Sequence, residues 1–141
     1  MAETLARLDM PRCVASSGLP ERIRLSLGVA GLLELFEPHI YSASMVQNGK
    51  PAPDLFLHAA QDMGVRPEAC VVVEDSPAGI MAARRAGMRV LGFAGGSHAA
   101  GWRLRSEIAR AGPDHNFDDM LDLPRLLRGP DGAGTAGAWT P

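Results

Sequence analysis

The sequence predicts an α/β fold in which a parallel sheet carries helices on both faces. Short apolar runs with strand character recur along the 141-residue chain, and segments with helical periodicity separate them. The runs are continuous rather than alternating, as in "CVVVE" at 70–74, which is typical of strands that are buried on both faces. Ligands of such sheets bind beyond the carboxyl ends of the strands, so polar residues at strand ends are the first candidates for a site.

The first half of the chain is expected to contain two strands. Residues 2–8 have the pattern of a helix end, and "RCVASSG" at 12–18 predicts a short buried strand that runs into a Ser/Gly turn. Pro20 suits the first turn of a helix, which we expect to reach about Leu27 before Gly28 interrupts it. The other elements expected in this half are a helical turn at 32–36, a strand at 39–44 and a loop at 47–53.

Helix boundaries are well marked in the second half. Pro53 is expected at the first position of a helix that Gly64 ends. Ser76 and Pro77 predict the capped start of another helix, which is expected to stop at Gly87. The other expected elements are strands at 70–74 and 89–94, helices at 100–111 and 118–128, and a short edge strand in "PDHNF". We expect residues 1–128 to form one core domain and residues 129–141 to form a flexible tail.

Composition excludes several classes of function. Hydrophobic residues make up 46% and charged residues 21% of the chain, and the net charge is −2. These values indicate a globular protein without a nucleic-acid or membrane partner. No apolar run approaches the roughly 18–20 residues that span a bilayer, and the N-terminus lacks the apolar core of a signal peptide. Cys13 and Cys70 lie in apolar runs, which predicts buried free thiols in a cytoplasmic protein.

Two adjacent acids, Glu74 and Asp75, follow the most apolar strand. Neighbouring carboxylates repel each other unless a cation or hydrogen-bond donors hold them. Carboxylate oxygens are ligands that Mg²⁺ accepts, together with water and substrate phosphate. The alternative is structural: Asp75 caps the next helix and Glu74 points into water.

Two further polar groups lie in the loops after the first two expected strands. Ser16, Ser17 and Gly18 form a turn whose hydroxyls and backbone N–H groups suit an anion, although an ordinary capped turn has the same sequence. Lys50 lies between Gly49 and Pro51, and a stiff loop of this kind can present an ammonium to an anion. The alternative for Lys50 is a solvated loop lysine.

These three groups, taken in order, resemble motifs of the haloacid dehalogenase superfamily, in its phosphatase and phosphoglucomutase-like branch. "VASSG" is similar to the second motif of that family, "GKPAPD" to the third, and "VVVEDSPAGI" to the fourth. The resemblance implies a small phosphorylated metabolite as substrate and Mg²⁺ as cofactor. It implies the following roles: Ser16 and Lys50 in catalysis, Ser16, Ser17, Gly18 and Lys50 in phosphate binding, and Glu74 and Asp75 in metal binding.

One departure from the family pattern is plain. Family members begin with an Asp-x-Asp motif that provides the nucleophile and the general acid/base, and no two aspartates of this chain are separated by one residue. The nearest stretch, "FDDMLD", follows a late strand and does not match. The resemblance therefore implies an incomplete doubly wound, Rossmann-like sheet that lacks its first, central strand and the cap. We expect its two neighbours to meet directly, or another chain to fill the slot by self-association or as a complementing fragment.

Three functions remain open from the sequence. The first is a Mg²⁺-dependent phosphatase of a sugar phosphate or similar metabolite, working through an aspartyl phosphate in the intact family member, with this chain inactive alone. The second is a non-catalytic module that binds phosphate or a partner. The third is a 2-haloacid dehalogenase, which is less favoured because dehalogenases of this superfamily need no Mg²⁺ and the acid pair indicates a metal.

Overall fold

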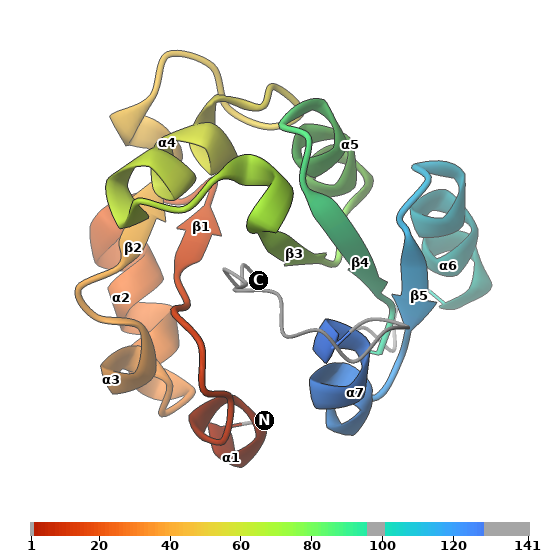
Figure 1. Ribbon diagram of the computed structural model, residues 1–141, viewed down its shortest axis with the longest axis horizontal. Helices are drawn as coiled ribbons and strands as arrows, with labels where there is room; N and C mark the ends of the chain where they lie inside the picture. Colours follow the sequence, from red (N-terminus) through yellow and green to blue (C-terminus); the bar gives the residue numbers. More distant parts are fainter. Residues whose placement is uncertain (1, 96–100, 129–141) are drawn as a thin grey trace.

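The computed structural model describes residues 2–95 and 101–128 of the chain. Within these residues the strands form two parallel sheets, one with the order β1-β2 and one with the order β3-β4-β5 (Figure 1). The strands are β1 (Val14–Ser16), β2 (Ile40–Ser42), β3 (Val71–Glu74), β4 (Arg89–Phe93) and β5 (His115–Phe117). In the register Val14 lies opposite Ile40, and Val71 lies opposite Arg89. The predicted α/β class and the edge strand in "PDHNF" are therefore confirmed.

The helices begin and end largely where the sequence predicts. They are α1 (Ala2–Ala6), α2 (Pro20–Val29), α3 (Leu33–Phe36), α4 (Asp54–Met63), α5 (Pro77–Arg85), α6 (Gly101–Arg110) and α7 (Leu123–Arg128), with short 3-10 turns at Ala43–Met45, Pro67–Ala69 and Met120–Asp122. Ser76 caps α5, because its Oγ accepts a hydrogen bond from the Gly79 N–H. Gly64 ends α4 in the left-handed region at φ 69°. None of these helices is long and apolar enough to cross a membrane.

Three predicted helix boundaries were wrong. The helix expected at 118–128 begins only at Leu123, after the 3-10 turn at Met120–Asp122. The helix α2 continues through Gly28 to Val29, and the left-handed residue that follows it is Gly31, at φ 73°. A glycine inside a helix costs about 1 kcal/mol, and the burial of Ile23 and Leu27 on α2 outweighs that cost. Pro53 is the N-cap of α4 rather than its first helical residue.

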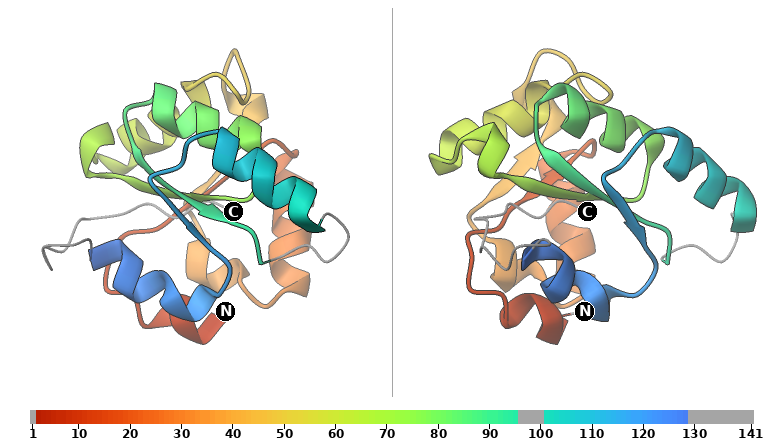
Figure 2. Two further views of the ribbon diagram at one scale, coloured as in Figure 1. Left: turned by 90° about the vertical axis from the view of Figure 1, so that its right-hand side faces the viewer. Right: turned by 45° about the vertical axis from the view of Figure 1, so that its right-hand side comes forward.

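Two hydrophobic clusters join the two sheets into one body. Successive residues of β3 alternate between them: Val72 belongs to one cluster, and Val71 and Val73 belong to the other. The first cluster contains Ala15, Tyr41, Phe56, Ile80 and Val90, and the second contains Val14, Ile40, Leu27, Leu91 and Leu123. Each cluster thus takes residues from both sheets. Figure 2 shows α4, α5 and α6 on one side of the larger sheet and α7 on the other, so helices cover both faces.

The strands β1 and β3 do not pair with each other. In the described part of the chain, β1 pairs with β2 and β3 pairs with β4. From the sequence we expected a first strand to be missing, and direct contact between its two flanking strands was one of the two expected solutions; the structure contradicts that contact. The reason is packing, because the two shared clusters fix the sheets while the Lys50 side chain lies between the strand ends. Filling of the slot by another chain stays a prediction, and the predicted tail at 129–141 lies outside the described residues.

Candidate functional site

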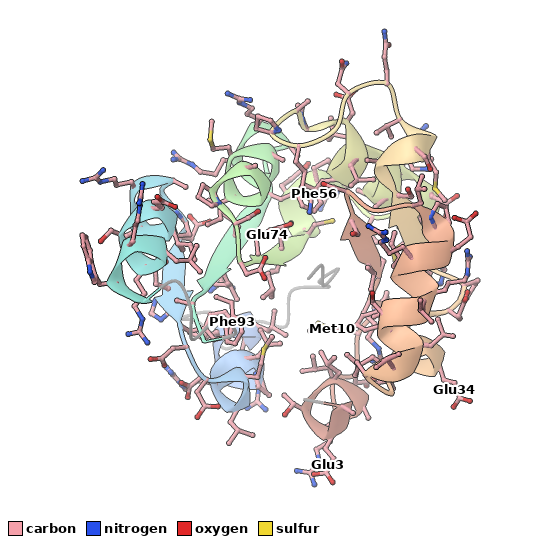
Figure 3. The ribbon with its side chains drawn as sticks, turned by 180° about the vertical axis from the view of Figure 1, so that it is seen from behind. Glu3, Met10, Glu34, Phe56, Glu74 and Phe93 are labelled. Atoms are coloured by element: carbon pink, nitrogen blue, oxygen red, sulfur yellow. The ribbon has the colours of Figure 1, made fainter. Side chains whose placement is uncertain are left out.

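An ion pair between Lys50 and Glu74 lies at the junction of the two sheets. The Lys50 ammonium contacts Glu74 Oε1, and the exposed fractions of the two side chains are 8% and 2%. The same ammonium donates a hydrogen bond of 3.1 Å to the Ala15 carbonyl of β1 and lies 5.0 Å from the centre of the Phe56 ring. The labelled Glu74 and Phe56 lie close together in Figure 3. Lys50 therefore connects the ends of β1 and β3 and is not a solvated loop lysine.

The loop that carries Lys50 is closed by its own polar groups. Both the backbone N–H and the side-chain amide of Asn48 donate to Asp54 Oδ2, each at 3.2 Å. The Ala52 N–H donates to the Gly49 carbonyl at 3.0 Å, which makes a tight turn around Lys50. The sequence predicted this loop from its glycine and prolines, but gave no sign that Asn48 and Asp54 close it.

Glu74 is held from the other side by the start of α5. The Ser76 hydroxyl accepts the Gly79 N–H at 3.1 Å, so its own hydrogen can be donated to Glu74 Oε2 at 3.2 Å. Burial raises the pKa of the Glu74 carboxyl, while the Lys50 ammonium opposes that shift. The structural alternative, with Glu74 pointing into water, is therefore wrong. Asp75 is exposed, and Ser76, not Asp75, caps the helix.

Gly79 lets the first turn of α5 approach the Glu74 carboxylate. A Cβ atom at position 79 would lie 2.0 Å from Glu74 Cδ and 2.1 Å from Oε2. The end of a glutamate side chain can move when it is exposed, but this one is buried and bonded to Lys50 and Ser76. Gly79 thus shapes the candidate site, and sequence analysis missed it. The visible sign was a glycine inside a predicted helix, five residues after the acid.

Gly79→Ala is expected to displace the Glu74 carboxylate and destabilise the chain by about 1–3 kcal/mol, the usual range for overpacking a buried site. The measurement is the free energy of unfolding in urea. Glu74→Asp, which shortens the side chain by one methylene, should make room for the new methyl group. The free energy of unfolding should therefore fall less in the double variant than the sum of the decreases in the two single variants.

Gly28→Ala is the matched control for this test. Gly28 also lies inside a helix, but a Cβ atom there would meet nothing within 4 Å. Replacing it should stabilise the chain by about 0.5–1 kcal/mol, because alanine is the better helix former. Equal effects of the two glycine substitutions would contradict the role of Gly79.

The Ser/Gly turn after β1 is fixed by a serine of the neighbouring strand. Ser16 is half-buried, and its Oγ accepts the Gly18 N–H at 3.2 Å, while Ser17 is exposed. Ser42 lies opposite Ser16 in the register, is fully buried, and donates its hydroxyl to the Gly18 carbonyl at 2.6 Å. Sequence analysis missed Ser42. A serine at the end of the next parallel strand was the available sign.

The acid pair has the right chemistry for Mg²⁺ but supplies too few ligands to complete its coordination shell. Carboxylate oxygens are what this ion prefers, and Asp75 is free to turn toward solvent. The Glu74 oxygens, however, accept hydrogen bonds from Lys50 and Ser76. Across the described residues there is no group of three or more His, Cys, Asp or Glu side chains that could hold a metal. Glu74 and Asp75 would therefore supply only part of the coordination shell.

The order of these groups along the chain agrees with a known family. The family model described as haloacid dehalogenase-like hydrolase matches residues 1–87, which include the Ser/Gly turn, the Lys50 loop and the acid pair. The chain belongs to the haloacid dehalogenase-like hydrolases. The resemblance found in the three motifs is thereby confirmed at the level of the family.

Relatives of this haloacid dehalogenase-like chain include phosphatases. It is 36% identical over 94 residues to 6-phosphogluconate phosphatase and 38% identical over 88 residues to hexitol phosphatase A, both from Escherichia coli. These matches cover 67% and 62% of the chain, and 42% and 39% of the relatives. The chain thus spans less than half the length of either enzyme.

A solved structure supports the fold. The haloacid dehalogenase family hydrolase from Deinococcus radiodurans, crystallised with bound phosphate and sodium, superposes with a TM-score of 0.80 at 38% sequence identity. The match covers 90% of this chain and 57% of that protein. The two sheets are therefore arranged as in a longer family member, although β1 and β3 do not pair.

Proposed function

We propose that the chain is the phosphate-binding part of a Mg²⁺-dependent phosphatase that acts on a small phosphorylated metabolite, such as a sugar phosphate. The observation that carries the proposal is the buried Lys50 ammonium between the ends of β1 and β3. Relatives also support the proposal. Two of them are named 6-phosphogluconate phosphatase and hexitol phosphatase A, and one solved relative contains bound phosphate.

Ser16 and Lys50 each have a hydrogen to offer an anion. Ser16 Oγ accepts from Gly18, so its hydroxyl hydrogen is available to a phosphoryl oxygen. An ammonium has three N–H groups, and within the described residues two of those of Lys50 go to Ala15 and Glu74. The third can be donated to the same phosphoryl group, which the exposed backbone at Ser17 would also contact, while Gly18 shapes the turn.

Glu74 and Asp75 would hold Mg²⁺, which when bound neutralises charge on the transferring phosphoryl group. Glu74 has a second task, since its carboxylate holds the Lys50 ammonium in place. The nucleophile is proposed to be an aspartate on a further strand between β1 and β3, on a complementing fragment or a second chain. That aspartate would attack phosphorus and break the P–O bond to the metabolite, whose oxygen leaves and takes up a proton. Water would then hydrolyse the aspartyl phosphate to inorganic phosphate and free the aspartate.

We also propose a cytoplasmic location. Both cysteines are buried free thiols. Burial raises the pKa of the Cys13 thiol to about 12, with a smaller effect from Cys70, so this thiol stays protonated and unreactive at neutral pH. Free thiols of this kind are typical of proteins from reducing compartments.

The proposal is tested by titrating the chain with inorganic phosphate and with MgCl₂ in a calorimeter. Phosphate is expected to bind weakly, and Ser16→Ala should lower its affinity about ten- to a hundredfold, because a hydrogen bond to a charged group contributes roughly 1.5–3 kcal/mol. Mg²⁺ alone is expected to bind more weakly than micromolar, because the acid pair completes only part of an octahedral shell.

Ser26→Ala is the control for the phosphate titration, since Ser26 is exposed on α2. Phosphate binding that Ser16→Ala leaves unchanged would overturn the assignment of the Ser/Gly turn. Submicromolar Mg²⁺ binding would show that the chain has a metal site other than the one proposed.

A further inference from the structure

The last residue of α5 contacts the loop that carries Lys50. Arg85 Nη1 donates a hydrogen bond of 3.1 Å to the Pro51 carbonyl, and Pro51 is the residue directly after Lys50. This is a contact across 34 residues of sequence, and it fixes the middle of the loop, whereas the bonds between Asn48 and Asp54 close its ends.

The start of helix α5 thus contacts Glu74 of the buried ion pair, and its end contacts the residue next to Lys50. At its start, Ser76 donates to the Glu74 carboxylate and Gly79 leaves room for it. At its end, Arg85 holds the backbone next to Lys50. A displacement of the loop relative to α5 would therefore pull the ammonium away from the carboxylate.

We infer that Arg85 is a positioning residue for Lys50: by holding the Pro51 carbonyl against α5, it keeps the ammonium between Ala15 and Glu74. Arg85 acts through Lys50 and does not touch substrate. An effect of Arg85 on phosphate binding rests on the proposed function. The effect of Arg85 on the position of Lys50 does not depend on that function.

The chain offers a direct probe of this placement, because Lys50 is its single lysine. Acetylation by an N-hydroxysuccinimide ester, followed by mass spectrometry of the peptide that contains residue 50, measures how often this ammonium leaves its buried position. The α-amino group is quantified on its own peptide. All variants are acetylated at the same pH, and at urea concentrations far below those that unfold the chain.

Arg85→Ala is expected to raise the acetylation rate of Lys50 about three- to tenfold, which corresponds to the loss of one hydrogen bond. Arg85→Lys, whose ammonium can donate to the same carbonyl, should restore most of the protection. The two lysines of that variant lie on separate tryptic peptides, because Arg66 and Arg84 lie between positions 50 and 85.

Arg84→Ala is the matched control. Arg84 is adjacent on α5 and makes one hydrogen bond of similar length, 3.3 Å, but to the Ala111 carbonyl after α6. Arg84→Ala should therefore leave the acetylation rate of Lys50 at the wild-type value. An unchanged rate in Arg85→Ala, or an equal rise in Arg84→Ala, would overturn the inference. If the chain fails to bind phosphate in the titration, the acetylation rates of Lys50 should still change as described. The two proposals are therefore tested separately.

Discussion

The 141-residue chain, purified alone, is expected to show no measurable phosphatase turnover. Removing a catalytic nucleophile commonly lowers the rate by about 10⁴–10⁶, with the remainder due to binding and electrostatics. Here Ser16 and Lys50, the proposed phosphate-binding groups, are in place, but this sequence contains no Asp-x-Asp motif to carry out the covalent step. The loss is therefore expected at the high end of that range.

The measurement is hydrolysis of an aryl phosphate and of a panel of sugar phosphates with Mg²⁺. A separately made fragment with a strand that ends in Asp-x-Asp is then added. Activity that appears only with the fragment would support the proposed complementation at β1 and β3. The same fragment with its first aspartate replaced by asparagine is the control, because it can fill the slot without supplying a nucleophile.

Two outcomes would contradict these expectations. Mg²⁺-dependent turnover by the chain alone, abolished by Asp75→Asn, would mean that a nucleophile exists among its own residues. If a fragment binds without restoring any activity, the chain fits the alternative of a non-catalytic phosphate-binding module, which retains Ser16 and Lys50 for binding alone.

Lys50→Met is expected to lower the free energy of unfolding by about 3–5 kcal/mol. Breaking a buried ion pair from one side leaves a buried charge without its partner, and that cost is larger than the net value of the pair. Glu74 is 2% exposed and, among the residues that the structure describes, would keep only Ser76 as a side-chain donor. Lys50 also links β1 to β3, so its loss removes a polar contact between the two sheets.

The measurement is urea unfolding followed by circular dichroism. Lys50→Met combined with Glu74→Gln removes both charges, and this double variant should be more stable than Lys50→Met alone. Arg24→Met is the control, because Arg24 pairs with Glu37 at exposed fractions of 45% and 37%, and such surface pairs contribute about 0–1 kcal/mol. Equal losses for the buried and the exposed pair would show that burial of Lys50 does not matter for stability.

The sequence was a good guide wherever the deciding physics is local. The Ser76 cap and the left-handed stop at Gly64 depend on a few neighbouring residues, and both were predicted correctly. The continuous apolar runs predicted strands that are buried on both faces, because that pattern reports burial directly. The prediction failed at Gly28, where the packing of Ile23 and Leu27 against distant residues outweighs the low helix propensity of glycine.

The sequence alone also selected the chemical groups of the site, since the serine turn, the lysine loop and the acid pair each follow a predicted strand. It could not show that Lys50 binds Glu74, 24 residues away, or that Ser42 and Gly79 shape their surroundings. Those contacts depend on how parallel strands and α5 come together in space. Only the tertiary structure decided that β1 and β3 remain apart, because two clusters shared by both sheets fix their spacing without backbone pairing.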